Sequence, residues 1–283
     1  MKRSTFALRR RFSLGALLFC AAMLCLSGGA LAQEAEKGPS EARWKELQPI
    51  LFADKTILDG SEVLTLHAPD RAVEAALVPI SVSAKFPQSP GRYVKSIALV
   101  IDENPAPLAA TFHFTPESGR ADIETRVRVN DYGFVHAVAE TNDGKFYAVK
   151  TYVKAAGGCS APMSKDAAAA ALRIGQMKFQ QLGAFQPGAP NRGQLMISHP
   201  NHTGMQMDQL TRLYVPPHYI QTINVTIDGK AVLTVDADIS LSEDPHIRFT
   251  YVPGAHSAMT VTVKDSQDKT FTESWKLGAQ RGA

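Results

Sequence analysis

The sequence has few cysteines, and those it has are not arranged to pair with one another. It contains three, of which Cys20 and Cys25 lie in an apolar stretch close to the start. If that stretch is removed on export, Cys159 remains without an intramolecular partner, which excludes a disulfide framework. A single cysteine flanked by glycines, a serine and a proline is typical of an accessible, reactive thiol rather than of a small buried hydrophobe.

The chain also lacks an excess of one charge. The whole sequence has 30 lysines and arginines against 27 aspartates and glutamates, with a formal net charge of +3. Five of the basic residues lie in residues 1–32, which contain no acid, so 25 basic and 27 acidic residues follow them. The balance of −2 after residue 32 gives no support for a nucleic-acid or membrane-surface partner.

Motifs for common hydrolase and nucleotide chemistry are missing as well. The sequence contains no Gly-x-Ser-x-Gly element and no glycine-rich phosphate loop. Asp102 and Glu103 lie in the segment IDENP, whose asparagine and proline indicate a turn rather than a catalytic carboxylate pair. We therefore expect a protein that is not an enzyme and uses no cofactor. A thiol enzyme stays an alternative, because a fold can bring a histidine to Cys159.

The histidines do not form a recognisable metal motif along the chain. Five of them occur in the second half: His199, His202, His218, His246 and His256. Zinc sites use ligands at recurring spacings, but Pro200 lies between the nearest two histidines and no second pair repeats their spacing. We expect these side chains to hydrogen-bond within loops, with no metal site.

The first 32 residues have the features of a secretory signal peptide. Basic residues, among them Arg9, Arg10 and Arg11, precede an apolar run at residues 14–26, and Ala-Leu-Ala at 30–32 gives a small-x-small cleavage site. The run is shorter than the roughly 20 residues of a membrane span. Because Arg-Arg-Arg-Phe also fits a twin-arginine signal, both Sec and twin-arginine export stay open. We expect a periplasmic protein with no membrane segment after cleavage.

Short runs of alternating or β-branched residues predict strands along the rest of the chain. They lie at residues 63–66, 76–84, 94–101, 109–114, 123–129, 133–140 and 145–153, and then at 176–182, 194–198, 220–227, 230–235, 247–252, 259–264 and 270–277. Asn-Asp-Gly at 142–144 and Asp-Gly at 228–229 predict hairpin turns. This spacing favours a mainly β fold built from immunoglobulin-like β-sandwiches.

Two short helices and a division into three segments complete the predicted organisation. WKELQPILF at 44–52 and SKDAAAAALR at 164–173 favour helices, the second through its run of alanines. We expect one sandwich over residues 41–154 and a second over 174–279. Residues 155–173 are expected to join them as a flexible arm and a short helical linker.

The predicted arm defines the candidate site. Gly157, Gly158 and Ser160 surround Cys159, and glycine's conformational freedom predicts a flexible segment that carries the thiol into solvent. A thiolate can hold a persulfide, a thiosulfonate or a mixed disulfide. Cys159 is therefore the predicted point of covalent sulfur attachment.

Several segments resemble the SoxY and SoxZ families, the two subunits of the sulfur carrier of bacterial thiosulfate oxidation. The SoxY-like segments are PDRAVEAALVPISV (69–82), IDENPAPLAATFHF (101–114) and AAGGC (155–159). The SoxZ-like segments are ISHPNHTGMQMDQLTR (197–212), VPPHYI (215–220) and LSEDPHIRFTY (241–251). With both halves on one chain, the sequence is similar to the fused SoxYZ-like carriers associated with quinoprotein dehydrogenases.

The resemblance implies two immunoglobulin-like sandwiches, a periplasmic location and covalent sulfur intermediates on Cys159. The partners it implies are sulfur-oxidising enzymes, or quinoprotein and cytochrome redox enzymes. The family's arm ends in Gly-Gly-Cys-Gly-Gly at a free C-terminus, whereas here Ser160, Ala161 and Pro162 follow the thiol and the arm is joined at both ends. The alternative is an accessory binding module of a quinoprotein alcohol dehydrogenase system, with the thiol incidental or redox-sensing. A dimer linked through Cys159 also stays open.

Overall fold

The structure is a computed structural model that describes residues 41–162, 170–209 and 211–278. The predicted signal peptide at residues 1–32 and most of the predicted helix at 164–173 lie outside these residues. None of the helices in the described part of the chain has the length and apolar character needed to cross a membrane.

The described chain is mainly β, as the alternating patterns predicted. The first half forms α1 (Ala42–Phe52), β1 (Ile57–Asp59), β2 (Leu64–His67), β3 (Val78–Ala84), β4 (Val94–Ile101), β5 (Leu108–Phe114), the 3-10 turn η1 (Pro116–Ser118), β6 (Asp122–Val127), β7 (Gly133–Thr141) and β8 (Phe146–Val153). The second half forms β9 (Met177–Leu182), β10 (Asn191–Ile197), β11 (Ile220–Ile227), β12 (Lys230–Ala237), β13 (His246–Tyr251), β14 (Ala258–Asp265) and β15 (Thr270–Lys276). Every predicted strand corresponds to one of these strands, whereas β1 was not predicted.

Both predicted hairpins are confirmed. Asp228 and Gly229 join β11 to β12 with φ angles of 49° and 81°, and positive φ at both positions is what a two-residue turn of this hand requires. Gly144, between β7 and β8, has a φ of 80°, and its N–H donates to the carbonyl of Thr141. Glycine adopts this backbone conformation without the steric cost that a Cβ would bring.

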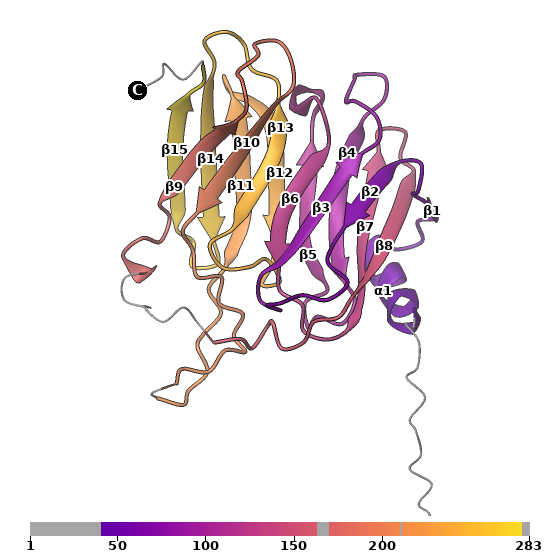
Figure 1. Cartoon of the computed structure of the whole chain (residues 1–283), viewed down its shortest axis with the longest axis vertical. Helices are drawn as coiled ribbons and strands as arrows, with labels where there is room; N and C mark the ends of the chain where they lie inside the picture. Colours follow the sequence, from indigo (N-terminus) through magenta and orange to yellow (C-terminus); the bar gives the residue numbers. More distant parts are fainter. Residues whose placement is uncertain (1–40, 163–169, 210, 279–283) are drawn as a thin grey trace, which may run out of the picture. The chain divides into compact units, whose positions relative to one another are not determined.

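The strands pair into two sheets, and each sheet runs through both halves of the chain (Figure 1). One sheet has nine strands in the order β1-β8-β7-β4-β5-β12-β11-β14-β15. The other has six in the order β2-β3-β6-β13-β10-β9. The halves meet where β5 pairs antiparallel with β12 and where β6 pairs antiparallel with β13. They are therefore joined edge to edge by backbone hydrogen bonds, which the sequence did not predict.

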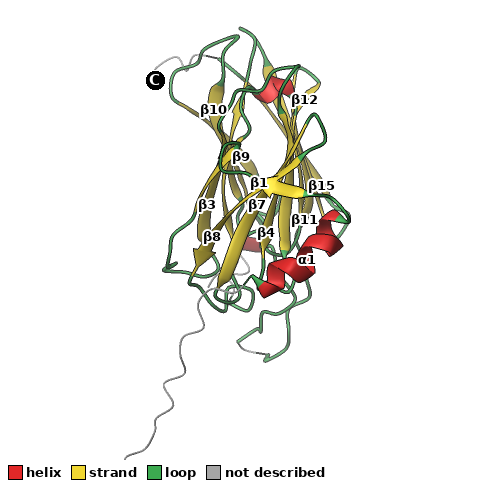
Figure 2. Ribbon diagram, turned by 90° about the vertical axis from the view of Figure 1, so that its right-hand side faces the viewer, coloured by secondary structure: helices red, strands yellow, loops and turns green. Residues whose placement is uncertain are grey.

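The two sheets lie face to face as the layers of a sandwich (Figure 2). Alternating side chains of each strand point between them, and one cluster of buried apolar residues extends through both halves. It includes Phe112 and Ile123 from the first half and Val235 and Phe249 from the second. Burying a side chain of this size contributes roughly 1.5–3 kcal/mol, so the two halves stabilise each other through a shared core.

Helix α1 covers the outer face of the nine-stranded sheet at its first-half end. Trp44 and Leu47 are buried there against β4 and β7. The Trp44 ring stacks on the ring of His136, with the ring centres 3.9 Å apart and the planes within 11° of parallel. Nδ1 of His136 lies 3.0 Å from Oδ1 of Asp102, and both side chains are buried. Asp102 therefore begins the turn after β4, as predicted, and also forms a buried pair with a histidine.

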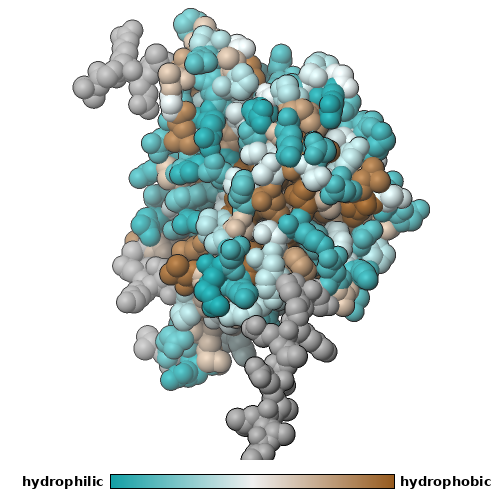
Figure 3. Space-filling model, turned by 45° about the vertical axis from the view of Figure 1, so that its right-hand side comes forward, coloured by the Kyte–Doolittle hydropathy of each residue, from teal (hydrophilic) through white to brown (hydrophobic). Residues whose placement is uncertain are grey.

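The face of the molecule drawn in Figure 3 is mixed in polarity. Figure 3 shows apolar side chains gathered in patches near the middle of the face, with hydrophilic side chains around and between them. The exposed large apolar residues of the first half include Ile50 of α1 and Leu58 of β1. Interrupted patches of this kind are usual on solvated protein surfaces.

Candidate functional site

Cys159 lies in a turn that follows β8 and closes onto the second half of the chain. The N–H groups of Gly157 and Gly158 donate to carbonyls of the segment after β6, at 2.8 and 2.9 Å. The N–H of Ser160 donates to the carbonyl of Gly157 at 3.2 Å. From the second half, Oγ1 of Thr203 donates to the carbonyl of Cys159 at 2.6 Å. Backbone and side-chain hydrogen bonds thus hold the turn on both sides.

The thiol is buried, so the prediction of an exposed sulfur on a free arm is wrong for this conformation. Cys159 is 0% exposed. A Cβ on Gly158 would overlap the carbonyl oxygens of Ala75 and Val129, and Gly157 has a φ of +79°. The two glycines therefore permit a close backbone approach and a left-handed turn. Small residues around a cysteine suit a packed turn as well as an exposed arm, and the sequence signal did not distinguish the two.

Arg128 is a charged residue that contacts this turn. Its side chain is buried, with Nη1 donating to the carbonyl of Gly158 at 3.1 Å and Nη2 to the carbonyl of Asn201 at 3.4 Å. Burial raises the pKa of the Cys159 thiol to about 11, and the Arg128 guanidinium acts in the opposite direction. The thiol is therefore protonated at neutral pH and weakly nucleophilic in this conformation.

Polar groups surround the Cys159 turn at the end of the sandwich. The continuous apolar core of the described residues does not include Cys159. The second half covers the turn with residues 199–206, which follow β10 and which we call the 199–206 loop. This loop supplies Thr203 and Asn201, which contact the Cys159 carbonyl and the Arg128 guanidinium. The loop therefore helps to hold the turn in which the thiol is buried.

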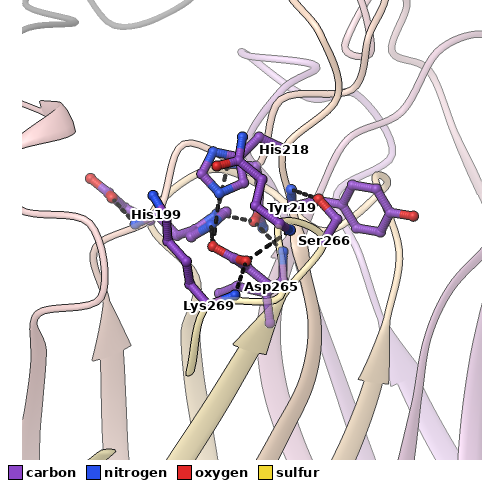
Figure 4. A network of polar contacts seen from close by, with 10 residues as sticks. His199, His218, Tyr219, Asp265, Ser266 and Lys269 are labelled. Atoms are coloured by element: carbon purple, nitrogen blue, oxygen red, sulfur yellow. Dashed lines mark hydrogen bonds and ion pairs between the residues drawn. The ribbon is translucent and has the colours of Figure 1, made fainter. Parts of the chain in front are cut away.

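The same end of the second half holds a buried cluster of His199, His218 and Asp265, which we call the His-His-Asp cluster (Figure 4). His199 follows β10, His218 precedes β11, and Asp265 ends β14. Nε2 of His218 lies 2.8 Å from Oδ2 of Asp265, and Nε2 of His199 lies 3.6 Å from the same oxygen. Three segments that are distant in sequence therefore bring two imidazoles to one carboxylate.

Backbone N–H groups fix the Asp265 carboxylate from its other side. Its Oδ1 accepts from the N–H groups of Gln267 and Lys269, at 2.9 and 3.0 Å, in the turn between β14 and β15 (Figure 4). Burial opposes ionisation of Asp265, but the hydrogen bonds from His218 and from these backbone groups hold the pKa of its carboxyl below the usual value. The cluster thus contains one ionised and rigidly oriented carboxylate.

The predicted histidines divide into two groups in the fold. His202 lies beside the cluster, because His202 and His218 exchange backbone hydrogen bonds at 2.7 and 3.0 Å. His246 begins β13 and His256 is exposed in the loop before β14. Chain spacing had made His199 and His202 the nearest pair, but the fold brings His218 and Asp265 to His199. Nothing in their sequence positions, 19 and 66 residues from His199, signals that contact.

Two immunoglobulin-like β-sandwich halves thus share their sheets, and the one cysteine among the described residues lies buried in a turn between the end of β8 and the 199–206 loop. Residues 49–159 match the family described as sulfur oxidation protein SoxY, and residues 180–276 match the family described as sulphur oxidation protein SoxZ. The chain belongs to these families as a fused SoxY/SoxZ-like sulfur carrier. Proteins of the two families carry sulfur, are not catalytic enzymes, and work with redox enzymes of sulfur oxidation.

Solved structures include similar chains. The sulfur carrier protein SoxY from Chlorobium limicola f thiosulfatophilum is 20% identical, with a match that covers 40% of this chain and 91% of that chain and a TM-score of 0.32. A superoxide reductase (neelaredoxin) from Ignicoccus hospitalis is 15% identical, with 32% of this chain and 79% of that chain covered and a TM-score of 0.30. No curated protein matches the chain. The family assignment rests on the two family matches.

Proposed function

We propose that this protein is a periplasmic carrier that holds sulfur intermediates covalently on Cys159 and presents them to redox enzymes of sulfur oxidation. One observation carries the proposal: the SoxY match extends over residues 49–159, so its last residue is the only cysteine of the described chain. A thiolate forms sulfur–sulfur bonds readily, which suits a covalent carrier. The predicted signal peptide at residues 1–32 supports the periplasmic location.

Loading of this thiol is an oxidation, and a partner must accept the electrons. Joining thiosulfate to Cys159 forms one sulfur–sulfur bond, releases the thiol proton and removes two electrons. In this proposal the redox enzyme that loads the carrier accepts the two electrons. We propose a sulfur-oxidising enzyme, or a quinoprotein or cytochrome enzyme, as that partner.

The buried thiol requires an opening step before it can be loaded. The bonds from Thr203 to the Cys159 carbonyl and from Arg128 to the Gly158 carbonyl hold the turn closed. Each such hydrogen bond contributes roughly 1 kcal/mol net, and a bond from a charged group roughly 1.5–3 kcal/mol. Opening therefore costs a few kcal/mol, which the binding of a partner enzyme can supply.

The segment that continues from the 199–206 loop supports a partner contact near the thiol. It extends away from the sheets (Figure 1) and carries Leu213 and Tyr214, which are 69% and 67% exposed. The 199–206 loop, which directly precedes this segment, holds the Cys159 turn closed through Thr203. Exposed aromatic and aliphatic side chains are common anchors of protein interfaces. An enzyme that binds this segment is well placed to displace the loop from Cys159.

Intact-mass spectrometry of the protein tests the proposal directly. The protein is isolated without reductant from its native host, grown with thiosulfate, and compared with the Cys159→Ser variant. We expect added mass of one or more sulfur atoms, or of a thiosulfonate, on the wild-type chain only, with peptide mapping to Cys159. An unmodified thiol in every preparation, with substrate present, contradicts the proposal.

A second candidate function is favoured by the burial of the thiol and its pKa of about 11. In this alternative the protein is an accessory binding module of a quinoprotein dehydrogenase system, with Cys159 incidental or redox-sensing. The Cys159→Ser variant separates the two functions. A binding module keeps its partner and its effect on the partner's activity, whereas a sulfur carrier keeps partner binding but loses sulfur transfer.

A further inference from the structure

The tautomer of His199 can be assigned from its neighbour. Nδ1 of His199 lies 2.7 Å from Oδ1 of Asn201. The amide orientation of Asn201 is fixed, because its Nδ2 donates to the carbonyls of Leu241 and Ser242 while its Oδ1 accepts from the N–H of Ile220. An oxygen that only accepts requires a donor, so Nδ1 of His199 carries the proton. The Asn201 N–H also lies 3.1 Å from Nδ1, but we assign the tautomer from the shorter contact.

This tautomer leaves a lone pair on Nε2 of His199, deep in the protein. That nitrogen is buried and has no hydrogen-bond partner. It lies 3.6 Å from Oδ2 of Asp265, which is also a lone-pair atom, and both side chains are 0% exposed. Two electron-rich atoms therefore face each other with no hydrogen between them.

A third donor atom converges on the same point. Nε2 of His218 lies 2.8 Å from Oδ2 of Asp265, and the three donor atoms all lie within 4.8 Å of one another. Zinc-type ions bind imidazole nitrogens at about 2.0–2.1 Å and carboxylate oxygens at about 2.0–2.2 Å, which places ligand atoms roughly 3.4 Å apart. The 3.6 Å between Nε2 of His199 and Oδ2 of Asp265 already suits such an ion. The 2.8 Å between Nε2 of His218 and the same oxygen has to lengthen by about half an ångström.

We propose that Nε2 of His199, Nε2 of His218 and Oδ2 of Asp265 bind one divalent transition-metal ion of the zinc type. Two neutral imidazoles and one carboxylate suit such ions, whereas calcium and magnesium prefer oxygen ligands. On binding, the ion takes the place of the proton on Nε2 of His218, which leaves to solvent while Nδ1 of that ring takes one up. The bonds that orient the ligands, from His199 to Asn201 and from backbone N–H groups to Asp265, are typical outer-shell contacts of metal sites.

A pocket adjoins two of the three proposed ligands. A pocket of about 130 Å³ is lined by His199 and His218 and also by His202 and Glu243. Since a water molecule occupies about 30 Å³ of liquid, the pocket has room for water or a small anion as a further ligand. The ion would also anchor the start of the 199–206 loop, whose Thr203 holds the carbonyl of Cys159. The proposal does not depend on what Cys159 carries.

Metal titration of the untagged protein, as its host exports it, tests the proposal. The protein is stripped with a chelator and titrated with ZnCl₂ by calorimetry, and with Co²⁺ by visible absorption. We expect one ion per chain and the intense Co²⁺ bands of a site with few ligands. The His199→Ala variant should bind Zn²⁺ at least about 100-fold more weakly, because it loses a direct ligand. The matched control is His256→Ala, which removes an exposed histidine and should bind as the wild type does.

Three results overturn the proposal: no Zn²⁺ binding to the wild type at micromolar concentrations, equal binding by the His199→Ala and His256→Ala variants, or a Co²⁺ spectrum of the hydrated ion. If His199→Ala fails to fold, as judged by circular dichroism, X-ray absorption of the Zn²⁺-loaded wild type decides. Two imidazole ligands with oxygen support the site, whereas a sulfur ligand from Cys159 or an all-oxygen shell overturns it.

Discussion

The chain buries two histidine–aspartate pairs, one in each half, and their surroundings differ. In the first half, His136 and Asp102 lie 3.0 Å apart, and the ring of Trp44 covers the histidine. In the second half, His218 and Asp265 lie 2.8 Å apart, and His199 approaches the same carboxylate oxygen. The first pair lies under helix α1, whereas the second lines a pocket.

An unpaired buried atom is common to both sites, so it does not distinguish them. Nε2 of His136 and Nε2 of His199 are both buried without a hydrogen-bond partner. Within the described ranges, only His199, His218 and Asp265 bring three metal-binding side chains together. The convergence of donor atoms, more than burial or a missing hydrogen bond, separates a candidate ligand site from a pair that stabilises the fold.

The largest effects expected are on stability, and they should be similar at the two pairs when no metal is present. Asp102→Ala and Asp265→Ala each leave a buried histidine without its carboxylate, which should lower the free energy of unfolding by about 3 kcal/mol. Urea unfolding measures the change. As a control, Lys95→Ala breaks the exposed pair between Lys95 and Glu140 and should cost less than about 1 kcal/mol. An equal loss of unfolding free energy in all three variants would show that burial of the pair does not determine the destabilisation.

Zinc should then separate the two pairs. At a free Zn²⁺ concentration of 100 times the Kd, binding to the folded state alone stabilises a protein by about 2.7 kcal/mol. We expect this gain in urea unfolding of the wild type and of Asp102→Asn, and a gain of at most about 0.4 kcal/mol in His199→Ala. An equal gain in all three proteins would place the ion elsewhere.

The pH dependence of alkylation should reveal the environment of the thiol. With a pKa of about 11 in place of 9.0, the thiolate fraction of Cys159 at neutral pH is about 100-fold lower than in the unfolded chain. The rate with iodoacetamide should therefore keep rising with pH towards 11 in the folded protein, and level off near 9 in urea. Mass spectrometry of the Cys159 peptide measures both rates. A plateau near 9 in the folded protein would indicate a thiol that reacts from an open, solvated state.

The smallest effect concerns the hydrogen bond that closes the 199–206 loop on the Cys159 turn. Thr203→Val removes the donor to the Cys159 carbonyl, a loss of roughly 1 kcal/mol, and should speed alkylation about 5-fold through more frequent opening. Thr262→Val is the matched control, because that hydroxyl contacts only Thr272 in the described contacts, on the far strand pair β14–β15. Equal rates in the two variants would rule out this bond as part of the closure.

The local patterns of the sequence predicted the strands well, because alternation and turn residues act over a few positions. Ile220–Ile227 and the turn at Asp228 and Gly229 are examples, and β1 (Ile57–Asp59) was missed because three residues are too few to show a period. The pairing of β5 with β12 was not predictable in this way, since it joins strands that are more than 100 residues apart.

The candidate sites were predicted less completely, for two physical reasons. Glycine next to Cys159 indicated freedom of the backbone, but the overlap that a Cβ on Gly158 would cause depends on Ala75 and Val129, which lie far away in sequence. His218 and Asp265 reach His199 only because β10 and β14 end, and β11 begins, at the same side of the sandwich. Contacts of this kind depend on the tertiary fold, and residue spacing does not encode them directly.

The pairing of β5 with β12 and of β6 with β13 also determines what would happen if the two halves were made as separate polypeptides. Each half would then have edge strands with unpaired backbone N–H and C=O groups. Such edges readily pair with strands of other molecules. Synthesis as one polypeptide supplies each sheet edge with its partner strand at one-to-one stoichiometry and high local concentration. The linkage therefore disfavours pairing with the halves of other molecules. Each Cys159 turn is then covered by the 199–206 loop of the same chain.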